Sequence, residues 1–136
     1  MNPDTWEVFH DGIISKIEGS MPGDLSIHIE ITYLREMFPG EGKGFIVTLK
    51  NCSSFEYEEY LVEGRVEIPI KDMVIIAQKK PILLYVDCTD PVVIDCAIGT
   101  LRIEYMTAES SLDSGEAVSD EQLIEASKSY WKNFGK

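Results

Sequence analysis

An alternating stretch decides the fold of this chain: Leu25-Ser26-Ile27-His28-Ile29-Glu30-Ile31-Thr32-Tyr33. A period of two is typical of a half-buried β-strand, with apolar residues facing the core and polar residues facing solvent. Antiparallel sheets with one solvated face give this pattern. Just before the stretch, Met21-Pro22-Gly23-Asp24 suits a type II turn, because proline presets φ and glycine accepts a positive φ. The sequence therefore predicts a β-hairpin over residues 12–34.

Further short alternating stretches follow through the first 105 residues. They centre on residues 45–50, 66–70, 82–86, 92–98 and 101–105. No long helical pattern separates them, and parallel crossovers need a dozen or more residues, so antiparallel pairing is expected. The predicted fold is mainly β: either an antiparallel sandwich or a curled barrel of seven or eight strands, with one C-terminal α-helix.

Single segments within this region differ in character. Residues 82–86 are apolar on both faces, which is typical of a central strand, whereas Pro69 indicates an edge strand. Residues 71–80 fit either a helical turn or a loop. Residues 39–44 are rich in glycine and include Lys43, but they lack the order of a phosphate-binding loop and are expected to form a hairpin loop.

The chain changes character after Met106. Residues 107–118 are polar and acidic with glycine and serine, which predicts a linker. Ser119-Asp120-Glu121-Gln122 then matches a capping box, and acids lead while bases follow, as suits a helix dipole. We expect a helix over 119–134 that docks on the sheet through its large aromatic side chains, which are Tyr130, Trp131 and Phe134.

Length and composition are those of one globular domain. The chain has 136 residues, of which 44% are hydrophobic and 26% charged, and domains commonly run to about 100–150 residues. We therefore expect a single domain over 1–136, divided into a β core at 1–106, an acidic linker at 107–118 and the helix at 119–134.

The charge excludes some classes of function. There are 24 acidic and 12 basic residues, giving a formal net charge of −12. Nucleic-acid binding and docking on anionic membranes both need clustered Lys and Arg, so neither is expected. No apolar run approaches the roughly 20 residues that span a bilayer. The N-terminus lacks the features of a signal peptide, and three cysteines form no disulfide framework, so a reducing cytoplasm is the expected location.

Candidate catalytic and metal-binding residues are few. His10-Asp11 is the one adjacent His–Asp pair, but a hydrolase of that type needs further ligands, so a structural histidine and a turn-capping aspartate are favoured. Cys88 and Cys96 have seven residues between them, which does not match zinc spacing and favours buried thiols. No catalytic residue, metal or cofactor is therefore predicted, and an enzyme is not favoured.

Acidic segments are the most informative feature. Residues 51–64 hold four acids, with neither Lys nor Arg between them: Glu56, Glu58, Glu59 and Glu63. Residues 103–127 hold seven acids and again no base. One interpretation is a solubilising surface; the other is a docking face for a basic protein. On the second interpretation, the first segment is the contact site and the second, in the linker, acts as a diffuse field.

The opening residues carry a family resemblance. Trp6-x-x-Phe9-His10-Asp11-Gly12, followed by a turn and the alternating strand, resembles small bacterial β-rich proteins that begin with W-x-x-F-H-D-[AG]. These are uncharacterised or similar to the immunity proteins of polymorphic toxin systems. The resemblance covers residues 6–34 and the C-terminal helix and implies an all-β fold with toxin neutralisation as a function. It gives no catalytic residues, so the five residues of the opening motif are expected to be structural.

Three hypotheses about function remain. The leading one is a cytoplasmic bacterial protein-binding domain, an immunity protein that neutralises a basic toxin. The second is a small hydrolase using His10 and Asp11. The third is a structural subunit that forms a homodimer through an edge strand near Pro69.

Overall fold

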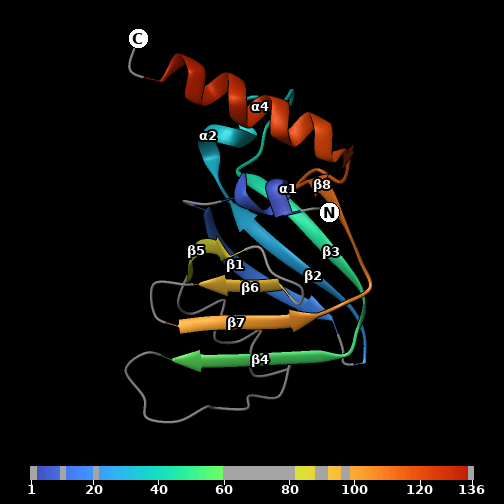
Figure 1. Cartoon of the computed structure of the whole chain (residues 1–136). Coiled ribbons are helices and arrows are strands. Elements are labelled where there is room, and N and C mark those ends of the chain that lie inside the picture. Colours follow the sequence, from blue (N-terminus) through green and yellow to red (C-terminus); the bar gives the residue numbers. More distant parts are fainter. Residues whose placement is uncertain are drawn as a thin grey trace.

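The computed structural model describes residues 3–9, 12–19, 22–59, 82–87, 92–95 and 99–134. Within these ranges the chain is mainly β, with short helices at one end and a long C-terminal helix (Figure 1). The helices are α1 (Pro3–Glu7), α2 (Thr32–Arg35) and α4 (Asp120–Asn133). The strands are β1 (Gly12–Gly19), β2 (Gly23–Glu30), β3 (Gly44–Cys52), β4 (Ser54–Glu59), β5 (Ile82–Asp87), β6 (Val92–Asp95), β7 (Gly99–Glu104), β8 (Thr107–Leu112) and β9 (Ala117–Val118).

The nine described strands form one antiparallel sheet in the order β4-β7-β6-β5-β1-β2-β3-β8-β9. The predicted hairpin is confirmed as β1 and β2, which pair from Ile13–Glu30 to Gly19–Leu25. The expected central strand, β5, lies between β1 and β6. The end strands β4 and β9 do not pair with each other, so a closed barrel is wrong. The predicted strand at 66–70 and the ambiguous 71–80 segment lie outside the described residues.

Two long strands bend so that the sheet curves around one core. β3 continues into β4, and β7 continues into β8, with Ser53 donating its backbone N–H to Glu104 and Met106 donating to Lys50 at the bend. Asn51 has a φ of 54°, a left-handed conformation that asparagine tolerates, and its N–H donates to Asp24 Oδ1 at 3.0 Å. In Figure 1, β2 and β3 therefore run diagonally while β4 and β7 lie across the view.

The prediction of a linker at 107–118 is wrong. Residues 107–112 form β8, which pairs with β3 from Thr107–Lys50 to Leu112–Phe45. Ala108, Ser110 and Leu112 are buried while their neighbours are more exposed, so the strand does alternate. Its buried positions include alanine and serine instead of large apolar residues, which hides the period of two.

The alternating stretch ends earlier than expected. β2 stops at Glu30, and residues 32–35 form α2 although their polarity continues the strand pattern. Ile31 and Leu34 are both buried. Residues three apart lie on the same side of a helical turn, so Ile31 and Leu34 can both face the core from this turn, as alternate residues of a strand would.

The C-terminal helix α4 begins as predicted, with both hydrogen bonds of the capping box between Ser119 and Gln122. It packs against α1 and α2 at one end of the sheet (Figure 1). Leu123 is its fully buried anchor, whereas Trp131 and Phe134 are 39% and 64% exposed. The helix therefore docks with Leu123 as its buried anchor. Trp131 adds an edge contact to the ring of Tyr33 in α2, with centroids 5.8 Å apart, whereas Phe134 stays mostly in solvent. Within the described residues, no helix is long and apolar enough to cross a membrane.

Candidate functional site

The opening motif is structural wherever the structure describes it. Trp6 and Phe9 are buried in the core, and Trp6 Nε1 donates a hydrogen bond of 3.0 Å to the hydroxyl of Tyr105. A Cβ on Gly12 would lie 2.8 Å from both Ile29 Cγ2 and the Phe9 carbonyl oxygen, so this position requires glycine. His10 and Asp11 lie outside the described residues, and the hydrolase hypothesis therefore stays untested.

The sheet face that carries Arg102 and Glu104 is the candidate binding surface. Both residues are exposed, while Ile103 between them is fully buried in the core. Residues directly opposite each other on paired strands share a face of the sheet. The register of β4, β5 and β6 therefore tells which of their positions lie on the same outer face as Arg102 and Glu104.

The register gathers acidic positions on this outer face. On β4, Glu56 is opposite Arg102 and Glu58 is opposite Thr100. On β6, Asp95 is also opposite Thr100, and Val93 is opposite both Arg102 and Asp87 of β5. We call the resulting set the acidic face; it consists of Glu56, Glu58, Asp87, Asp95 and Glu104. Among the described positions of this face on β4, β5, β6 and β7, Arg102 is the one base.

The acidic segment predicted as the contact site is divided by this geometry. Glu56 and Glu58 lie on the acidic face, but Glu59 is opposite Gly99 and falls on the alternate face. Glu63 lies outside the described residues. Sequence reasoning missed Asp87 and Asp95 as members of the site. The period of two in residues 92–95 could have revealed Asp95, but only the pairing of β5 with β6 places Asp87 beside it.

The second acidic segment contains a structural carboxylate. Asp113 Oδ1 accepts a 2.9 Å hydrogen bond from Arg35 Nε, and Asp113 Oδ2 accepts from the backbone N–H groups of Lys43 and Gly44 at 2.7 and 3.2 Å. The Arg35 side chain is only 1% exposed and also donates to the carbonyl oxygens of Pro39 and Glu41 at 3.1 and 3.0 Å. We call this arrangement the Arg35–Asp113 clamp.

The electrostatics of the clamp favour an ionised Asp113. Desolvation by burial opposes ionisation, but hydrogen bonds from Arg35 and from the N–H groups of Lys43 and Gly44 outweigh it and lower the pKa of Asp113 below its ordinary value. Asp113 was expected to contribute to a diffuse field in a flexible linker, and this expectation is wrong. Its carboxylate instead accepts the hydrogen bonds that hold the loop between α2 and β3 against the end of β8.

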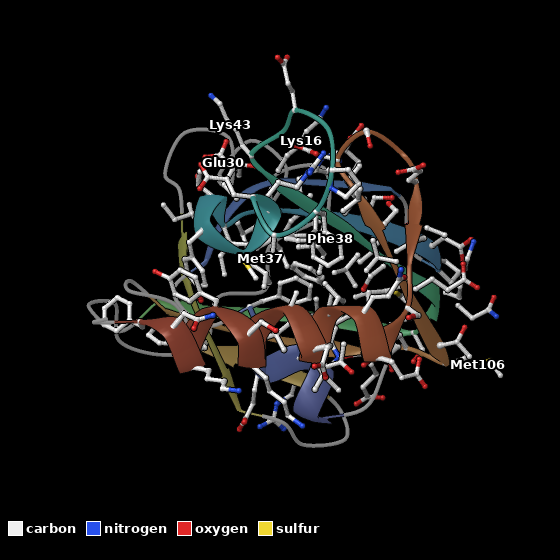
Figure 2. The ribbon with its side chains drawn as sticks, turned by 90° about the horizontal axis from the view of Figure 1, so that it is seen from above. Lys16, Glu30, Met37, Phe38, Lys43 and Met106 are labelled. Atoms are coloured by element: carbon white, nitrogen blue, oxygen red, sulfur yellow. The ribbon has the colours of Figure 1, made fainter. Side chains whose placement is uncertain are left out.

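A shallow polar groove lies beside the clamp. It has a volume of about 240 Å³, and Ser15, His28, Glu30, Lys43 and Asp113 contribute polar side chains to its lining. Figure 2 labels Glu30 and Lys43 of this set. Next to it, Glu18 Oε1 accepts from His28 Nε2 at 2.9 Å and from Lys16 Nζ at 3.1 Å. The hydrogen bond from Lys16 lowers the pKa of Glu18. In the part of the chain that the structure describes, no three His, Cys, Asp or Glu side chains converge as metal ligands.

The cysteine that the structure describes is buried. Cys52 is 1% exposed, its Sγ lies 3.6 Å from the carbonyl oxygen of Leu49, and burial raises the pKa of its thiol. A thiol whose pKa is raised is a poor nucleophile near neutral pH. Cys88 and Cys96 lie outside the described residues.

Large apolar side chains are exposed at the C-terminal end of α4. Tyr130 stacks on Tyr33 of α2 with a centroid distance of 4.3 Å, and Phe134 lies 5.9 Å from Tyr130. Met37, which is 41% exposed and is labelled in Figure 2, lines a groove of about 290 Å³ together with Tyr130 and Phe134. The stack fixes the end of the helix but leaves Phe134 in solvent.

Comparisons of the chain with protein-family models, curated proteins and solved structures find no match. We therefore infer a function from the geometry of the acidic face.

Proposed function

We propose that the protein is a bacterial protein-binding domain of the cytoplasm that docks on a basic partner through the acidic face. The observation that carries the proposal is the register of β4, β7, β6 and β5, which brings five acidic positions together around Arg102. Four strands supply them, and β4 is distant in sequence from the other three. A solubilising surface needs charge but no such convergence, whereas a docking face needs both.

The dimensions of the face suit electrostatic steering. Adjacent strands lie about 4.8 Å apart and alternate residues of one strand about 6.7 Å apart. Four neighbouring strands therefore hold the five positions within a width of about 14 Å. Neighbouring carboxylate positions then lie about 7–10 Å apart, comparable to the screening length of about 8 Å at physiological salt, so their fields overlap at an approaching partner.

Placement on strands also lowers the cost of binding. Carboxylates on a paired sheet are already ordered in the backbone, so association does not have to order a flexible segment. This supports the assignment of Glu56 and Glu58 to the contact surface. Glu59 and Glu63 contribute less in this proposal, since Glu59 belongs to the other face of β4.

The resemblance of the opening motif suggests toxin neutralisation as the biological role. A toxin that acts on nucleic acid must present Lys and Arg to bind phosphates. A sheet face that carries carboxylates at fixed backbone positions would occupy such a basic site in place of the polyanionic substrate. The partner in this proposal is therefore a basic toxin protein, and neutralisation consists of covering its substrate site.

The test is a comparison of two variants with equal charge change. E56Q/E58Q/E104Q removes three carboxylates from the acidic face. The matched control E36Q/E41Q/E109Q removes three exposed carboxylates elsewhere on the molecule. Wild type and both variants are used to capture partners from the native host, and the captured proteins are quantified by mass spectrometry. Association and dissociation rates with the captured partner are then measured at low and high salt.

We expect the wild type and the control to capture the same basic protein and the face variant to lose it. Its association rate should fall by roughly 10-fold or more at low salt, with a smaller difference at high salt. Equal capture by the two variants, or a rate that does not depend on salt, would show that the carboxylates serve solubility and not docking.

A further inference from the structure

The outward side of α4 carries a second ordered set of charges. Glu121, Glu125, Lys128 and Lys132 follow a spacing of four, three and four residues, and all four are exposed. At 100° per residue they span about 60° of the helix and lie opposite the buried Leu123. In Figure 2, which is a view from above, α4 lies nearest the viewer. We call these four residues the α4 charge stripe.

Two of the three neighbouring pairs in the stripe are unfavourable within a single helix. Side chains three or four residues apart are neighbours on a helix surface, so Glu121 repels Glu125 and Lys128 repels Lys132, while Glu125 attracts Lys128. Within the described residues, none of the four side chains forms an ion pair. A helix stabilised by its own charges would alternate the two signs at this spacing. The separated signs complement the helix dipole, but they leave four unpaired charges on one exposed line.

An antiparallel copy of the same helix would pair every charge of the stripe. With a two-fold axis level with the peptide bond between Ala126 and Ser127, Glu125 faces Lys128 of the second copy. In the same register Glu121 faces Lys132, and symmetry repeats both pairs. We propose that the protein self-associates as a symmetric dimer through α4, with the α4 charge stripe setting the antiparallel orientation.

The fold presents α4 for this contact. The helix has 14 residues, so it is about 21 Å long, and it lies at the end of the molecule away from β4 and β7 (Figure 1). Trp131, 39% exposed and three residues beyond Lys128, flanks the stripe with apolar surface. The proposal does not rest on the proposed function, since the acidic face lies elsewhere and stays open in such a dimer.

The expected dimer is weak and sensitive to salt. A stable protein interface buries about 1,200–2,000 Å² in total, which two short helices reach only in part. Ion pairs at an exposed surface contribute mainly orientation and are screened by salt. Wild-type protein should therefore dimerise in sedimentation equilibrium at high protein concentration and low salt, and dissociate when salt is raised.

Two charge-reversal variants test the pairing directly. E121K/E125K makes the whole stripe basic, and K128E/K132E makes it acidic, so each variant repels its own copy. Each should dimerise at least about tenfold more weakly than wild type. A one-to-one mixture of the two restores opposite charges at every position and should recover a dimer at least as strong as that of the wild type. Circular dichroism of each variant shows whether α4 remains folded.

Net charge alone predicts a different result. E121K/E125K lowers the magnitude of the net charge from −12 and would on that ground dimerise better than wild type. The control E41K/E109K makes the same change at exposed positions outside α4 and should leave dimerisation at least as strong. A wild-type protein that stays monomeric at low salt, or a mixture of folded variants that fails to associate, would overturn the proposal. Neither result bears on partner capture by the acidic face.

Discussion

Replacing Asp113 by alanine tests the Arg35–Asp113 clamp. The substitution removes the carboxylate that faces Arg35 Nε at 2.9 Å and leaves the guanidinium 1% exposed without its counter-charge. It also removes the acceptor for the N–H group of Lys43 at 2.7 Å. Arg35 keeps its hydrogen bonds to the carbonyl oxygens of Pro39 and Glu41, so the loop should loosen at its Lys43 end and not detach completely.

The magnitude follows from how much of the clamp is buried. Breaking a fully buried ion pair by removing one partner costs about 3–5 kcal/mol. Asp113 is 31% exposed, so water partly replaces it in the variant and screens the remaining charge. We therefore expect D113A to lower the free energy of unfolding by about 2–3 kcal/mol, and D113N, which keeps an acceptor oxygen, by about 1–2 kcal/mol.

Urea denaturation measures the loss, and amide hydrogen exchange locates it. Exchange at Lys43 should accelerate in D113A, while exchange in the β1–β2 hairpin should change only with global stability. The matched control is E116A, which removes an exposed carboxylate from the same connection between β8 and β9 and should change stability by less than about 0.5 kcal/mol. If D113A unfolds like E116A and Lys43 exchanges at its wild-type rate, the clamp does not hold the loop.

Three further outcomes are expected from the same structure. The pKa of Asp113 is lowered in the folded state, so its ionised carboxylate stabilises the fold above pH 3.8, and this contribution is lost as the pH falls from 3.8 through the lowered pKa. The acid side of a stability–pH curve should therefore be shallower for D113N than for wild type. L123A should lower the free energy of unfolding by about 2–5 kcal/mol because it leaves a cavity in the core, whereas W131A, at a side chain that is 39% exposed, should lower it by about 1–2 kcal/mol. Denaturation midpoints measure both losses, and equal losses would mean that the aromatic end anchors α4. G12A should lower the free energy of unfolding by about 1–3 kcal/mol because its Cβ would lie 2.8 Å from Ile29 Cγ2. G115A, with no atom within 4 Å of its Cβ, should cost only the strain of its φ of +104°, about 1 kcal/mol. A smaller loss for G12A than for G115A in thermal unfolding would contradict this packing.

The hairpin and the terminal helix were predictable because each is specified by a local pattern. Residues 25–30 alternate in polarity, and the register of β1 with β2 follows from burying one side of that alternation. The capping box of Ser119 and Gln122 satisfies backbone groups within four residues, so it can be recognised without tertiary context.

The remaining features depend on contacts distant in sequence. β8 has small and polar residues at its buried positions, and its pairing with β3 joins segments about sixty residues apart. Arg35 and Asp113 are separated by 78 positions. A buried arginine looks like a surface residue in a sequence, and only the fold shows that its counter-charge comes from the end of β8.

Counting charges therefore overestimates how many of them are available for binding. The same acidic composition includes a carboxylate that holds a loop, two that form part of the α4 charge stripe, and five positions grouped on one sheet face. Asp113 and Glu109 are four residues apart in one acidic segment, yet the first forms an ion pair with the buried Arg35 and the second forms none with the described residues. Register, and not local density of acids, distinguishes these roles, because neighbours along a strand alternate between faces while neighbours across strands share one. For that reason Asp87 and Glu56, distant in sequence, belong to one surface, whereas the adjacent Glu58 and Glu59 do not.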